Sequence, residues 1–126
     1  MSKPSRADEL ESRLIRFAAR IVALSAKLPH TPQGRHISGQ VLRSGTAAAA
    51  NYAEARGAES RADFIHKLRI AFKELNETTV WLRVLLESAM ISAEMTNNIV
   101  DIVAENRELC RIIVASIKTA RSSEQM

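Results

Sequence analysis

Three histidines, several carboxylates and a single cysteine are the side chains of this sequence that metal binding or catalysis would require. His30 and His36 flank a proline-containing loop, and Asp63 precedes His66 by three residues. A carboxylate-bridged di-metal bundle needs a Glu-x-x-His pair on each of two helices and two further carboxylates, and no such pair is present. We therefore expect surface histidines and no metal site.

Nucleophilic catalysis and phosphate binding by a glycine-rich loop are not indicated either. Cys110 lies beside Leu109, Ile112 and Ile113, which predicts a buried and unreactive thiol. The four glycines lack the spacing of a phosphate-binding loop. The sequence therefore predicts a protein that is not an enzyme and that carries no cofactor.

A row of basic residues near the N-terminus suggests a different activity. The row recurs every seven residues, close to two helical turns, and consists of Arg6, Arg13, Arg20 and Lys27, with Arg16 close by. Such a row can neutralise phosphates and attract RNA or DNA, and the net charge of +4 permits this. Because no aromatic residues interleave with the cations, contact would be with the nucleic-acid backbone. A solvated helix face with no partner is the alternative.

A second pattern is a stripe of polar residues in two segments that otherwise resemble inward-facing helices. On one helical face of each segment lie Gln40, Arg43, Asn51 and Glu54, and then Glu74, Glu77 and Trp81. We expect Arg43 to pair with Glu74 or Glu77, because an unpaired buried charge is costly. Three interpretations remain open: a network that fixes helix register or a subunit contact, a ligand or partner site, and ordinary surface.

Four helices, at about residues 5–28, 32–56, 61–88 and 93–121, must position these side chains. Ser5, Thr31, Ser60 and Ser92 are the expected N-terminal caps. Residues at helical spacing then mark the buried faces of three of the helices. They are Leu10, Leu14, Phe17, Ile21, Leu24 and Leu28 in the first helix, Phe64, Leu68, Ala71, Leu75, Thr78, Leu82 and Leu85 in the third, and Met95, Ile99, Ile102, Leu109, Ile113 and Ile117 in the fourth. Short loops predict an all-α, antiparallel up-down-up-down four-helix bundle that forms a single domain over residues 1–126.

Composition limits the class of protein further. The sequence is 46% hydrophobic but only 4% aromatic, so the core is expected to be aliphatic. No stretch approaches the roughly 18 uncharged apolar residues of a membrane-spanning helix. No secretory segment opens the chain, and a cytoplasmic location is expected.

The polar stripe resembles that of the bacterial four-helix bundle family first noticed as proteins encoded in intervening sequences of ribosomal RNA genes. The family pattern Gln-x-x-Arg-Ala-Ala-x-Ser-Ile-x-x-Asn-Ile-Ala-Glu-Gly is matched in register by Gln40, Arg43, Asn51, Ala53 and Glu54. The family's third helix is similar to Phe64, Leu68, Ala71, Glu74, Glu77, Trp81 and Leu82. Ala47, Ala48 and Ala55 stand where the family has Ser, Ile and Gly.

The resemblance implies a ring-shaped homo-oligomer, with five subunits as its size, and no enzymatic activity. A relative of the same fold is an accessory protein of diversity-generating retroelements that resembles a nucleic-acid-binding partner of reverse transcriptase. We therefore expect a homo-oligomeric scaffold or adaptor that contacts RNA or DNA through basic helix faces. The alternative is a protein-interaction or structural module without a nucleic-acid role.

Overall fold

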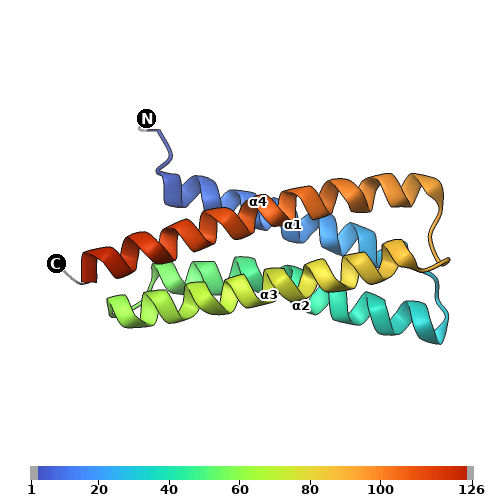
Figure 1. Ribbon diagram of the computed structural model, residues 1–126, viewed down its shortest axis with the longest axis horizontal. Coiled ribbons are helices and arrows are strands. Elements are labelled where there is room, and N and C mark those ends of the chain that lie inside the picture. Colours follow the sequence, from blue (N-terminus) through green and yellow to red (C-terminus); the bar gives the residue numbers. More distant parts are fainter. Residues whose placement is uncertain (1–2, 125–126) are drawn as a thin grey trace.

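The computed structural model describes residues 3–124, in which four α-helices and no strand are present. The helices are α1 (Arg6–Ala26), α2 (Pro32–Arg56), α3 (Arg61–Glu87) and α4 (Ala93–Glu124). Figure 1 shows the chain reversing its direction at each loop, so that consecutive helices lie beside one another. The predicted all-α four-helix bundle is confirmed.

Hydroxyl caps start each helix, as the sequence predicted. Ser5 accepts a hydrogen bond from the Asp8 backbone, and the Asp8 side chain accepts one from Ser5 in return. Thr31, Ser60 and Ser92 accept the equivalent bond from the backbone three residues ahead, at 3.0–3.1 Å. These bonds satisfy N–H groups that a helix start leaves without partners.

Three of the four C-terminal boundaries differ from the prediction by one to three residues, and α2 ends at Arg56 as predicted. α1 ends at Ala26, because Leu28 precedes Pro29 and the α-conformation is unfavourable for a residue before proline. Lys27 is therefore the C-terminal cap, outside the helix. α3 ends at Glu87, one residue early, and α4 extends to Glu124, three residues beyond the prediction.

The core is aliphatic, with one aromatic ring among its fully buried large side chains. These are Leu14, Phe17, Ile21, Leu24, Leu68, Leu75, Leu82, Leu85, Ile99, Ile102, Leu109 and Ile113. Three side chains predicted to be buried, Phe64, Met95 and Ile117, are only partly buried. They lie near the ends of α3 and α4, where fewer neighbours cover them, and Ile65 is the buried residue in the first turns of α3.

Close approach of α1 and α2 depends on a glycine. A Cβ atom added to Gly45 would lie 2.7 Å from Cγ2 of Ile21, a distance that real side chains do not tolerate. Ala48, one turn further along α2, is also fully buried. Small residues on α2 therefore make room for the larger side chains of α1.

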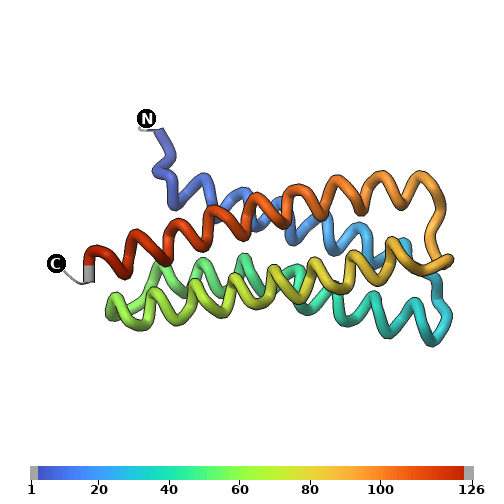
Figure 2. Tube along the Cα trace, in the orientation of Figure 1, coloured from blue at the N-terminus to red at the C-terminus, as the bar shows by residue number. Residues whose placement is uncertain are grey.

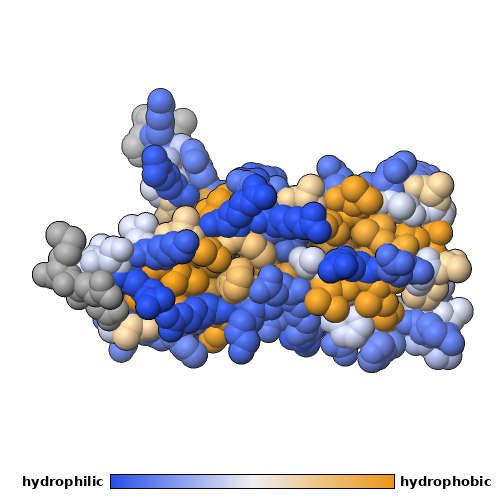
Figure 3. Space-filling model, viewed as in Figure 1, coloured by the Kyte–Doolittle hydropathy of each residue, from blue (hydrophilic) through white to orange (hydrophobic). Residues whose placement is uncertain are grey.

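Helix packing is uneven around the bundle. α2 and α3 share the most contacts, and among the helix pairs that touch, α1 and α4 share the fewest. The start of α1, the end of α4 and the α2–α3 loop lie at the same end of the bundle, which Figure 2 shows most clearly. Apolar side chains remain visible over α3 and α4 on the face seen in Figure 3. Within residues 3–124, no helix is both long enough and apolar enough to cross a membrane.

Candidate functional site

The predicted polar stripe lies along the outer side of the α2–α3 contact, and we call it the α2–α3 polar seam (Gln40, Arg43, Asn51, Glu54, Glu74, Glu77 and Trp81). Arg43 is at its centre. Its Nη1 atom lies 3.2 Å from Oε2 of Glu74, and its Nη2 atom donates to Glu77. Glu77 also accepts a hydrogen bond of 3.1 Å from the indole Nε1 of Trp81. The ion pair expected from the sequence therefore forms with both carboxylates.

The charged groups of the seam are exposed to solvent and stabilise one another at the protein surface, not in the core. The hydrogen bond from Arg43, followed by that from Trp81, lowers the pKa of Glu77. The hydrogen bond to Glu77 likewise raises the pKa of Arg43. The Arg43 side chain is 52% exposed, so solvent screens these pairs and their contribution to stability is small.

The remaining members of the seam make separate contacts. Asn51 donates to the Ala47 carbonyl at 2.9 Å, within its own helix. Glu54 pairs with Lys67 at 3.1 Å. Gln40 has no hydrogen-bond partner in the described part of the chain. The stripe is thus a central cluster with two flanking contacts, and its role as network, interface or ligand site stays a prediction.

Buried polar contacts that the sequence did not predict lie beneath this seam. The hydroxyl of Thr78 is 2.9 Å from that of Ser44, and both side chains are fully buried between α2 and α3. Thr79 donates to Oδ1 of Asn106 at 3.0 Å and so links α3 to α4. The sequence did carry a signal for the last contact, because Asn106 follows Ile99 by seven residues and so occupies a core position.

Cys110 is half-buried rather than fully buried. Its Sγ atom lies 3.5 Å from Oδ1 of Asn106, beside the α3–α4 contact. Burial raises the pKa of this thiol, so it stays protonated and unreactive at neutral pH. Among the described residues, no three His, Cys, Asp or Glu side chains gather closely enough to hold a metal ion.

The basic row of α1 is on the side of the helix that faces α4. Arg13 forms two hydrogen bonds of 2.7 Å with Glu105, through Nε and Nη2. Arg20 lies 3.0 Å from Asp101 and 3.3 Å from Asn98. Two of the cations proposed from the sequence as nucleic-acid contacts are therefore already paired within the chain.

The Arg13–Glu105 pair is the better shielded of the two. Its side chains are 34% and 25% exposed, against 37% and 75% for Arg20 and Asp101. The hydrogen bond from Arg13 lowers the pKa of Glu105 against the opposing effect of burial, and the positive charges of Arg20 and Arg16 lower it further. The carboxylate of Glu105 is thus a centre of attraction for three arginines of α1.

Three other cations of this region remain free of such pairing. Within residues 3–123, no carboxylate lies within 4.0 Å of Arg6, Arg16 or Lys27. Arg16 is exposed beside the Arg20–Asp101 pair, and Lys27 is exposed at the end of α1. These three are therefore the members of the row whose charge no described carboxylate neutralises.

An exposed apolar surface covers the seam between α1 and α2, and we call it the α1–α2 apolar patch (Ile15, Val22, Leu42 and Ala49). Ile15, Val22 and Leu42 are 55%, 49% and 38% exposed. Ile15 and Val22 follow Asp8 at seven-residue steps, and Asp8 pairs with Arg56 of α2, so both belong to the α2 side of α1. Leu42 follows Ser38, which donates to the Ser25 carbonyl of α1, by one helical turn.

Comparison with known proteins places this arrangement in a family. The sequence matches the family described as 23S rRNA-intervening sequence protein over residues 9–115. The chain belongs to this family. Within the 23S rRNA-intervening sequence protein family, the matched range contains the whole α2–α3 polar seam and most of the basic row, and it leaves out Arg6.

A solved structure gives the same result. It is described as a protein of unknown function from the S23 ribosomal protein family of Bacteroides thetaiotaomicron, and it is 38% identical to this chain. The alignment covers 90% of this chain and 99% of the other, with a TM-score of 0.80. No curated protein matches the sequence. The resemblance inferred from Gln40, Arg43, Asn51, Ala53 and Glu54 is thereby confirmed.

Proposed function

We propose that this chain is a non-enzymatic helical scaffold that associates with copies of itself through the α1–α2 apolar patch. The observation that carries this proposal is the exposure of three large aliphatic side chains, Ile15, Val22 and Leu42, along one seam of the bundle. A subunit contact would remove these side chains from water, and each would contribute about 25 cal/mol per Å² of apolar surface buried.

The total surface of the chain supports self-association. The protein exposes 7774 Å², whereas a compact monomer of 13.9 kDa exposes roughly 6,700 Å². A single elongated bundle thus leaves more surface in water than a typical protein of its mass. The family resemblance supports a closed ring, for which we propose five subunits.

Light scattering during size exclusion tests the proposal directly. We expect a particle with five times the chain mass of 13.9 kDa. Ile15→Glu and Val22→Glu should each reduce that mass without loss of helical circular dichroism, because a charge would be buried in the contact. Val80→Glu is the matched control, since Val80 is 57% exposed on α3 and lies outside the patch. A monomeric wild-type protein, or dissociation only by Val80→Glu, would refute the proposed contact.

A second proposal is that the scaffold contacts the phosphates of RNA or DNA. Arg6, Arg16 and Lys27 support it, because they have no carboxylate partner among the described residues. The description of the family names 23S rRNA, which makes RNA the first nucleic acid to test. The pairing of Arg13 and Arg20 within the chain favours the alternative, a protein-interaction module without this role.

Salt dependence separates the two possibilities. Three phosphate contacts predict a slope of roughly −2 to −3 for the logarithm of the binding constant against that of salt concentration. Arg16→Ala and Lys27→Ala should each lower the slope by about one, whereas Arg69→Ala on α3 should leave it unchanged. Binding that is absent at low salt, or that does not change between low and high salt, would exclude this second proposal.

A further inference from the structure

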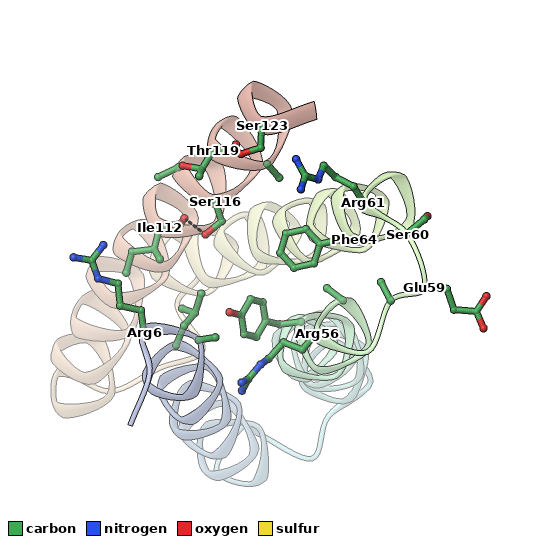
Figure 4. A pocket seen from close by; sticks show the side chains of 17 residues that line it. Arg6, Arg56, Glu59, Ser60, Arg61, Phe64, Ile112, Ser116, Thr119 and Ser123 are labelled. Carbon is green, nitrogen blue, oxygen red and sulfur yellow. Dashed lines mark hydrogen bonds between the residues drawn. The ribbon is translucent and has the colours of Figure 1, made fainter. Parts of the chain in front are cut away.

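A hollow of about 930 Å³ opens at the end of the bundle where α1 begins, α4 ends and the α2–α3 loop lies, and we call it the end cavity (Figure 4). All four helices contribute to its wall. The sides carry small residues, including Ala7, Ala55, Ala58, Ala115 and Ala120. The hollow forms because α1 and α4 pack loosely and these residues do not fill the gap between them. Its volume is within the range of about 300–1,000 Å³ typical of small-molecule sites.

The inner wall of the end cavity is apolar. Leu10, Tyr52 and Ala55 line it and are 7%, 5% and 1% exposed. Phe64 and Ile112, both only partly buried, lie on facing helices α3 and α4, as Figure 4 shows. The partial exposure of Phe64 that the sequence did not predict is therefore explained by its place in this wall. An apolar body of a ligand would cover these side chains.

The rim of the end cavity is positively charged. Arg6 of α1 and Arg61 of α3 stand on either side of the hollow in Figure 4, and neither has a carboxylate within 4.0 Å among the described residues. Arg56 also lines the hollow, but it is paired with Asp8 and Glu11. The acidic residue of the lining, Glu59, points away from the hollow. The uncompensated charge at the rim is therefore positive.

A free hydrogen-bond donor also reaches this hollow. The Tyr52 hydroxyl makes no hydrogen bond within the described part of the chain; Tyr52 as a whole is only 5% exposed, but its hydroxyl oxygen is not a fully buried atom and meets solvent in the hollow. Burial raises the pKa of this phenol, so the hydroxyl keeps its proton at neutral pH. The hydroxyl is therefore free to donate to solvent or to an oxygen of a bound ligand.

We propose that the end cavity binds an amphiphilic carboxylate, with its apolar body against Phe64 and Ile112 and its carboxylate at the arginine rim. The three features that define this ligand class are the apolar wall, the unpaired cations Arg6 and Arg61, and the donor hydroxyl of Tyr52. Arginine prefers carboxylate partners, because its planar donors match both oxygens. The site is separate from the α1–α2 apolar patch and does not depend on the proposed function.

Decanoate is the probe for this site, with decanol and acetate as matched ligands that lack the charge or the apolar body. We expect calorimetry to give one decanoate per chain, bound at least tenfold more tightly than decanol, and no binding of acetate. Amide signals of Tyr52 and Phe64 should shift in NMR spectra, and the indole signal of Trp81, about 25 Å further along α3, should not. Equal affinity for decanol, or shifts centred on Trp81, would refute the proposal.

Variants distinguish the cavity from general surface charge. Arg61→Ala and Arg6→Ala should each weaken decanoate binding about tenfold, the effect of one charge-assisted hydrogen bond. Arg69→Ala, an equivalent charge loss on exposed α3 surface, should not weaken it. An equal loss of decanoate affinity in all three variants would contradict binding in the end cavity.

A cavity-filling variant provides an independent test. Ala115 lines the hollow and is exposed, so Ala115→Trp can occupy the space without disturbing the core. We expect it to abolish decanoate binding with unchanged thermal stability, while Ala53→Trp on exposed α2 surface retains binding. Undiminished binding by Ala115→Trp would show that the ligand lies elsewhere, and failure of the wild-type protein to bind decanoate would end the proposal.

Discussion

The pairing of Arg13 with Glu105 predicts a measurable stabilisation of the weakly packed contact between α1 and α4. The pair has two hydrogen bonds of 2.7 Å, and both side chains are about two-thirds to three-quarters shielded from solvent. Exposed pairs contribute about 0.2–1 kcal/mol, and a bidentate, shielded pair should exceed that range. We therefore expect a coupling free energy of about 1–2 kcal/mol.

A double-mutant cycle with Arg13→Met and Glu105→Gln measures this coupling by urea denaturation. For a chain of 126 residues, the loss of about 1.5 kcal/mol corresponds to a fall of roughly 5 °C in Tm. The Arg20–Asp101 pair is the internal control, because it joins the same two helices but Asp101 is 75% exposed. Its coupling should be at most about 0.5 kcal/mol. Equal couplings for the two pairs would refute the argument from shielding.

The same cycle has a defined pH dependence. The pKa of Glu105 is lowered in the folded state, chiefly by the hydrogen bond from Arg13. A depressed pKa contributes stability that is complete above the unfolded value of about 4.3 and is lost as the pH falls through the folded value. The coupling should therefore be constant from pH 7 to about pH 5 and disappear in stronger acid. A coupling that persists below the folded pKa would be inconsistent with a charge-assisted pair.

Two further predictions concern α2 and α3. Gly45→Ala should destabilise the fold by about 1–3 kcal/mol, because the added Cβ would meet Ile21. Gly39→Ala has open space around the added Cβ and should stabilise the fold by about 0.5–1 kcal/mol. Thermal melts that rank the two variants in the opposite order would contradict the close approach of α1 and α2. Glu77→Ala removes the acceptor of the Trp81 indole, so Trp81 fluorescence should change while Tm changes little. A large fall in Tm would instead support a structural network in the α2–α3 polar seam, and a fall in particle mass would support a subunit contact there.

Local signals in the sequence predicted the helices well. Ser5, Thr31, Ser60 and Ser92 each start a helix, because a cap and the backbone it satisfies lie within three residues of each other. The pairing of Arg43 with Glu74 was also predictable, since the polar stripes of two adjacent helices bring opposite charges together.

Contacts between distant segments were not predictable from spacing. The seven-residue row that contains Arg13 and Arg20 indicates a shared face but not which helix that face meets, and their partners lie 92 and 81 residues away. The end cavity depends on how far α1 and α4 separate, so a helical pattern could not reveal that Phe64 would be partly exposed. Family membership was recoverable because its motif lies within two consecutive helices.

The sparse contact between α1 and α4 also has a kinetic consequence. Most contacts join helices that are consecutive in the chain, which gives a low contact order and predicts folding within microseconds to milliseconds. Packing of α1 onto α4 must bring together segments about 80–90 residues apart, which has the largest entropic cost of loop closure in the bundle. This contact should therefore form after the folding transition state. Interactions formed that late govern the unfolding rate. The lifetime of the folded chain, more than its rate of formation, should then depend on Arg13, Arg20 and their acidic partners.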